Sequence, residues 1–129
     1  MVTVTKRFEF CYGHNLPGYI GKCRNSHGHN AILEVEVAGP PMLESAQWKD
    51  PNMNYVGMVV DFGVLKAVVK SEVLDELDHS WFNDVPALGN PTAENLVDWI
   101  WVQLKRVFQG NLVRVRLYET PDSYAEKKD

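Results

Sequence analysis

The sequence predicts an α+β domain, in which an antiparallel sheet carries two helices on one face. Near both ends of the chain apolar residues alternate with polar ones, which is typical of strands with one buried face. Between these regions apolar residues recur at three- and four-residue spacing, which indicates amphipathic helices. The chain has 129 residues, 45% apolar and 23% charged, so we expect one domain, residues 1–129, with its own core.

Two strands are predicted near the N-terminus. The first covers residues 2–14, in which several aromatic residues and His14 share one phase. The second covers residues 31–37, where apolar residues alternate with glutamates. Extending its apolar phase backwards places His29 and His27 on the same side.

A long irregular segment between ordered elements is predicted at residues 39–55, which contain three prolines and several Asn and Asp residues. After it we expect a short strand at 58–61 and a helix over 62–77. A second helix begins after Asn90-Pro91-Thr92, which supplies cap residues and a proline near the first turn, and Gly110 is its expected stop.

The last strand is predicted at residues 113–119, with Glu119 in phase with the strand's apolar residues. A carboxylate is costly to bury without a partner. Glu119 therefore either lies just past the strand in water, or meets a ligand with a guanidine-like edge through two parallel N–H···O bonds.

The charge balance excludes some partners. Lys and Arg total 13 and Asp and Glu total 17, so the net charge is −4 with neutral His, and we expect no nucleic-acid partner. No run of about 18 apolar residues occurs, so we expect no membrane partner. The N-terminus shows no secretory signal, which favours a cytoplasmic location. Two cysteines are too few for a disulfide framework, so free thiols are expected.

Three histidines form a candidate metal site. His27 and His29 flank Gly28, and residues two apart in an extended segment project to the same side. His14 can supply a third nitrogen, and three neutral imidazoles with an open position form a catalytic zinc site. The alternative is that each is a hydrogen-bonded core histidine.

Cys23 lies four residues before His27 in a polar segment. It can be a fourth metal ligand, which would close the site and make it structural. It can instead be a base or nucleophile whose thiol pKa is lowered by the metal and by Arg24. A buried, inert thiol fits the polar segment less well.

Asp78 and His79 are adjacent at the end of the first predicted helix. A carboxylate beside a histidine can orient it for general acid–base work. The alternative is an ion pair on the surface at a helix end.

Six short motifs together resemble the 6-pyruvoyl-tetrahydropterin synthase family, which includes bacterial 6-carboxy-tetrahydropterin synthase. In order they are Phe10–His14, Cys23–His29, Gly57–Phe62, Leu77–His79, Asn90–Glu94 and Glu119-Thr120. The resemblance implies the tunnelling fold, whose small subunits assemble into a barrel-bearing homo-oligomer, often a hexamer. It also implies active sites between subunits, so that Asp78 and His79 serve a neighbour's zinc.

The resemblance further assigns roles to eight residues. It implies that His14, His27 and His29 bind Zn²⁺. It makes Cys23 the general base, with Asp78 and His79 as its partners in proton transfer. It makes Glu119 the anchor of the pterin ring and places Thr92 in the same pocket.

The implied substrate is 7,8-dihydroneopterin triphosphate. The leading expectation is the carboxy-forming reaction, which releases triphosphate and acetaldehyde on the way to 7-deazaguanine and queuosine. The alternatives are the pyruvoyl-forming reaction, which keeps the three-carbon chain, and a non-catalytic zinc-stabilised module. Arg24 stands where a folate-precursor branch carries Glu, which argues against that branch. Cys11-Tyr12-Gly13 stands where many carboxy-forming members have small residues.

Overall fold

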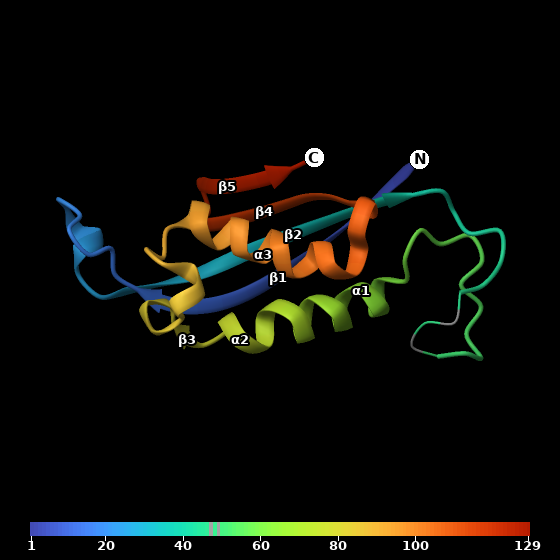
Figure 1. The fold of residues 1–129 in the computed structure, drawn as a ribbon, viewed down its shortest axis with the longest axis horizontal. Coiled ribbons are helices and arrows are strands. Elements are labelled where there is room, and N and C mark those ends of the chain that lie inside the picture. The colour runs from blue at the N-terminus through green and yellow to red at the C-terminus, as the bar shows by residue number, and fades with distance from the viewer. Residues whose placement is uncertain (47, 49) are drawn as a thin grey trace.

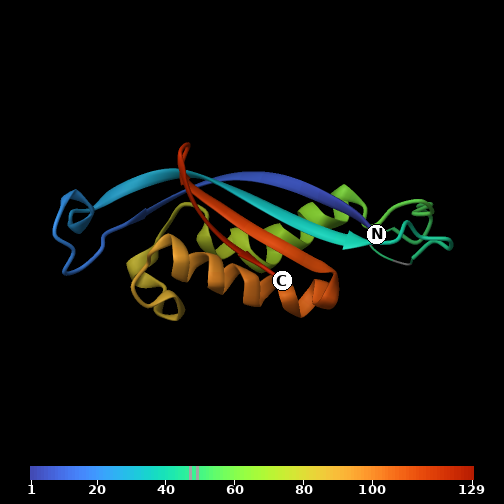
Figure 2. The same cartoon turned by 90° about the horizontal axis from the view of Figure 1, so that it is seen from above.

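The computed structural model describes residues 1–46, 48 and 50–129. Its five-stranded sheet has the order β3-β1-β2-β4-β5, and the helices cover one face of it (Figures 1 and 2). The strands are β1 Val2–His14, β2 His27–Gly39, β3 Ser80–Trp81, β4 Leu112–Thr120 and β5 Ser123–Lys128. The helices are α1 Phe62–Val69, α2 Asp75–Leu77 and α3 Ala93–Phe108. The predicted fold class is confirmed, although the sheet is mixed because β3 pairs parallel with β1.

Strands β1 and β2 form a long antiparallel hairpin that pairs over the full length of both strands. The second strand begins at His27, four residues earlier than predicted. This extension places His27 directly opposite His14, and His29 directly opposite Tyr12. Residues 15–26 form the loop that projects from this end of the hairpin (Figure 1).

The core lies between the sheet and the helices. The inward apolar residues of β2 are at most 3% exposed and belong to one buried cluster with residues of α1 and α3; they are Ala31, Leu33, Val35 and Val37. The first predicted helix is continuous but contains a π-helical turn at Lys70–Leu74. A π turn adds a residue, which rotates the apolar stripe. Val73 is fully buried, whereas Leu74 is only partly buried.

The predicted strand at 58–61 is wrong. This segment pairs with Met42 instead of with a strand. The Met42 N–H donates to the Met58 carbonyl, and the Gly57 N–H donates to the Met42 carbonyl. Asp61 then caps α1 by accepting a hydrogen bond from the Val64 N–H at 3.0 Å.

Two other predicted details also differ at the C-terminal end of the fold. Helix α3 ends at Phe108, and Gln109 rather than Gly110 adopts a positive φ of 49°. A bulge opposite Glu36 and Val37 turns Leu112 into the core and leaves Val113 half-exposed. No helix in the described ranges is both long and apolar enough to cross a membrane.

Candidate functional site

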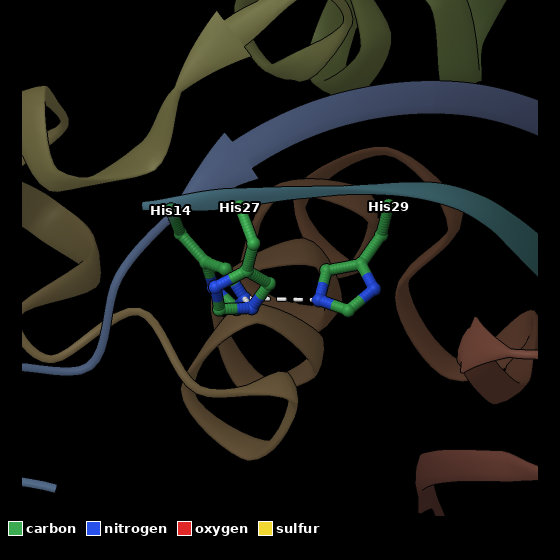
Figure 3. Close-up of side chains that lie close together, drawn as sticks. All are labelled: His14, His27 and His29. Atoms are coloured by element: carbon green, nitrogen blue, oxygen red, sulfur yellow. Dashed lines mark hydrogen bonds between the residues drawn. The ribbon is translucent and has the colours of Figure 1, made fainter. Parts of the chain in front are cut away.

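Three imidazoles converge at the loop end of the β1–β2 hairpin (Figure 3). His14 ends β1, and His27 and His29 lie on the first turn-side positions of β2, two residues apart on the same side. The Nε2 atoms of His14 and His27 are 2.9 Å apart, and those of His14 and His29 are 3.1 Å apart. All three residues offer a nitrogen within 4.8 Å of the others, which fits a shared metal ion.

Backbone carbonyls fix the orientation of two of these rings. The Nδ1 of His14 lies 2.8 Å from the Pro91 carbonyl oxygen, and the Nδ1 of His27 lies 2.7 Å from the Asn25 carbonyl oxygen. A carbonyl only accepts, so each Nδ1 carries a proton, and in the neutral ring Nε2 then presents a lone pair. Lone pairs facing each other at this distance require a cation or a proton between them. This pattern is that of metal-binding histidines held by outer partners.

Burial also keeps two of the rings neutral. It lowers the pKa of His14 and of His29, and in both it outweighs the nearby Glu119 carboxylate, which acts in the opposite direction. Neutral imidazole is the form that binds metal.

These lowered pKa values predict how acid affects metal retention. Protons compete with the metal only when the pH falls to the imidazole pKa, so retention should be complete at pH 7 and persist below about 6.5, the pKa of an unperturbed histidine. Zinc content measured after dialysis at stepwise lower pH checks this. Loss of half the zinc already above pH 7 would contradict it.

Glu119 lies near the end of β4 and turns toward the histidines. Its Oε1 is 3.3 Å from the Nε2 atoms of both His14 and His29, and 27% of its side chain is exposed. Thr92 caps α3 through its hydroxyl, which accepts from the Asn95 N–H at 3.2 Å. Glu119, which contacts two of the histidines, and Thr92 line one cavity of about 410 Å³.

Tyr12 is a site residue whose contact the sequence did not reveal. Its hydroxyl donates to the Glu119 Oε1 at 3.3 Å, and its ring stacks on Phe82 with centroids 3.9 Å apart. Burial, and secondarily Glu119, raises the pKa of Tyr12, so the hydroxyl remains a donor. The available signal was its position, two residues before His14 on the same face of β1.

Cys23 lies in the β1–β2 loop, within the short helical turn Lys22–Arg24. Its carbonyl accepts from the Leu16 N–H at 2.7 Å, and the residue is half-buried. Within the described part of the chain, its thiol is not among the donors grouped with the three histidines.

Asp78 and His79 lie between α2 and β3, where the His79 Nδ1 is 2.8 Å from the Asp78 Oδ1. The pair adjoins Cys11, because the Cys11 N–H donates to the Asp78 Oδ1 at 3.1 Å. Cys11 and His14 are three apart on β1, so their side chains point to opposite faces of the sheet. Within one chain the structure therefore separates Asp78 and His79 from the three histidines.

The sequence profile of a family described as 6-pyruvoyl tetrahydropterin synthase matches residues 3–129. The chain belongs to this family. It is 32% identical to a 6-carboxy-5,6,7,8-tetrahydropterin synthase of Haemophilus influenzae, with all of both chains covered. It is 39% identical to a 6-pyruvoyl tetrahydrobiopterin synthase of Dictyostelium discoideum, over 81% of this chain and 71% of that protein.

Solved structures of the family share the fold. The 6-pyruvoyl tetrahydropterin synthase of Caenorhabditis elegans superposes with a TM-score of 0.77 at 28% identity, covering 99% of this chain and 95% of that one. The family resemblance carried by the six motifs is therefore confirmed, and with it the fold.

Proposed function

We propose that this chain is a zinc-dependent 6-carboxy-5,6,7,8-tetrahydropterin synthase. It converts 7,8-dihydroneopterin triphosphate with loss of triphosphate and acetaldehyde, in the cytoplasm, on the route to 7-deazaguanine and queuosine. The observation that carries the proposal is the convergence of three imidazoles beside the Glu119 carboxylate, which lines a cavity. Two relatives with the 6-carboxy name, matched over 100% and 92% of their lengths, support it.

His14, His27 and His29 would hold the zinc. A donor set of three neutral imidazoles suits Zn²⁺ and leaves room for a further ligand. When bound, zinc supplies a Lewis acid that polarises oxygen atoms of the substrate side chain. The carbonyls of Pro91 and Asn25 keep two of the rings aimed at it.

Glu119 would anchor the pterin. The amino-pyrimidinone edge presents two N–H groups, and a carboxylate accepts two such bonds in parallel. The Tyr12 hydroxyl donates to one oxygen of this carboxylate, which restrains Glu119 where it lines the cavity. Thr92 lines the same cavity. Lys22 and Arg24 are exposed beside Cys23 and bring positive charge to a triphosphate.

Cys23 would remove substrate protons as the general base, and His79 would relay them. The Asp78 carboxylate orients the His79 ring through the 2.8 Å contact at Nδ1 and leaves Nε2 free for the proton. Because this pair lies on the far side of β1 from its own histidines, it would act at a neighbour's site.

A site shared between neighbouring chains requires a homo-oligomer. From the family resemblance we expect a hexamer. The sheet ends in β3 on one side and β5 on the other, and the outer backbone groups of edge strands can pair with a second copy. A composite site of this kind needs at least two chains.

Product analysis tests the function. Zinc-loaded protein is incubated with 7,8-dihydroneopterin triphosphate, and triphosphate and acetaldehyde are measured, with chelator-treated protein as the control. We expect both products and loss of both after chelation. Triphosphate without acetaldehyde would overturn the carboxy-forming assignment, and neither product would indicate a non-catalytic zinc-stabilised module.

The second candidate is the pyruvoyl-forming reaction. The Dictyostelium relative named for the tetrahydrobiopterin enzyme is 39% identical, against 32% for the Haemophilus relative. Tyr12 adds a bulky group behind the pterin anchor, which would alter how the substrate side chain lies. The acetaldehyde measurement separates the two reactions.

A further inference from the structure

A second group of side chains with metal-ligand chemistry lies on the opposite face of β1 from the three histidines. Cys11, Asp78 and His79 each offer one donor atom, and all three atoms lie within 4.8 Å of one another. They line an open cavity of about 370 Å³. In the single chain Cys11 is half-buried, whereas Asp78 and His79 are exposed, so an ion from solution can reach them there.

The backbone holds this group in place. The His79 N–H donates to the Cys11 carbonyl at 2.7 Å, and the Cys11 N–H donates to the Asp78 carboxylate at 3.1 Å. His79 adopts a φ of 60°, a conformation that residues other than glycine rarely take. Strained residues held by their surroundings are concentrated at functional positions. Tyr12 and Ser80, the residues directly after Cys11 and His79, pair in the β1–β3 ladder. This pairing also restrains Cys11 and His79.

The donor set matches zinc. Thiolate sulfur, imidazole nitrogen and carboxylate oxygen are all zinc ligands, and the charge of thiolate plus carboxylate balances a divalent ion. The His79 Nδ1 and the Asp78 Oδ1 now share a proton at 2.8 Å. Tetrahedral ligands at about 2.0–2.1 Å from zinc lie roughly 3.3 Å apart, so replacing that proton by the metal requires an opening of about half an ångström.

We propose that Cys11, Asp78 and His79 form a second site for a divalent transition metal, distinct from the three-histidine group. Binding at the His79 Nδ1 releases the Cys11 thiol proton to solvent and moves the Nδ1 proton of the neutral imidazole to Nε2. One consequence rests on the proposed function, in which His79 relays protons. Metal at this site occupies that imidazole, so zinc in excess of one equivalent inhibits the enzyme.

Cobalt titration tests the site without using turnover. Protein loaded with one equivalent of zinc is titrated with cobalt(II) chloride, and both bound cobalt and the thiolate-to-cobalt charge-transfer band are followed. We expect one further equivalent of cobalt, with the band, in the wild type and in Cys23→Ser. We expect neither the extra equivalent nor the band in Cys11→Ser, which should keep its zinc and so report its own folding.

Three results would overturn the proposal: no second equivalent in the wild type, an unchanged second equivalent in Cys11→Ser, or a band lost only in Cys23→Ser. The inhibitory consequence has its own readout. The zinc concentration that halves turnover should rise at least about tenfold in Cys11→Ser, because loss of a ligand weakens binding by that order or more. Cobalt binding as expected in a protein without turnover would reject the proposed function and leave this site standing.

Discussion

Replacing His27 by alanine is expected to release the metal and to reduce turnover below detection. The imidazole is one of three donors, and its Nε2 lies 2.9 Å from that of His14. Loss of even an outer partner of a metal ligand costs about 10–100-fold in affinity, so loss of a ligand should exceed that. His27 is half-buried, whereas His14 is fully buried, so His27→Ala carries less risk of misfolding.

The measurement is zinc content by elemental analysis after gel filtration, together with triphosphate release. His79→Ala is the matched control, because it removes a histidine on the opposite face of β1. That variant should retain one equivalent of zinc at the three histidines. Stoichiometric zinc that persists in a folded His27→Ala/Cys11→Ser double variant, which lacks one ligand of each proposed site, would show that the metal is held elsewhere.

Two inactive variants are expected to restore each other when mixed. Cys23→Ala and His79→Ala should each lose about 10²–10⁴-fold in turnover, as is usual for general acid–base groups, while retaining zinc. In one chain Cys23 lies in the β1–β2 loop and His79 lies beside Cys11. A shared site takes Cys23 from one chain and His79 from its neighbour. It is intact when the first chain is the His79→Ala variant, which keeps Cys23, and the neighbour is the Cys23→Ala variant, which keeps His79.

Random reassembly of equal amounts makes roughly a quarter of such sites intact, so about a quarter of wild-type turnover should return. Each variant dissociated and reassembled alone is the control and should stay inactive. If differently tagged chains copurify and the mixture is still inactive, the two residues do not meet across a subunit boundary.

Local sequence signals predicted the elements that shape the site. The first strand was predicted to end at His14, and it does, because alternation persists up to that residue. The Thr92 cap marks the start of α3 correctly. The grouping of the three histidines required only the two-residue period of a strand and the pairing of neighbouring strands. Their role as zinc ligands stays a prediction.

Elements whose pairing is long-range were missed. Strand β3 has two residues, too few to show a period, and forms only by pairing with Tyr12 and Gly13. Strand β5 is polar because it is an edge strand, and its Glu126 carboxylate pairs with the Arg116 guanidinium at 2.6 Å. Pairing with β4 brings these charges together. An apolar pattern in the sequence does not predict such a strand.

The same limit applies to the surroundings of the site. The phase of Glu119 predicted that it could face inward, but its contact with Tyr12 joins residues 107 positions apart. Cys11 meets Asp78 across 67 positions. Such contacts depend on how α1 and α2 cross the sheet, which periodicity does not specify.

The coordination of the bound zinc tests the central claim most directly, namely that the three histidines form a catalytic rather than a structural centre. X-ray absorption at the zinc edge should be measured on the protein with one equivalent of zinc, and again on Cys23→Ala. The account predicts three nitrogen ligands and one further light atom, with the same spectrum in both proteins. A sulfur ligand that disappears in Cys23→Ala would mean a closed, four-ligand site and would contradict it.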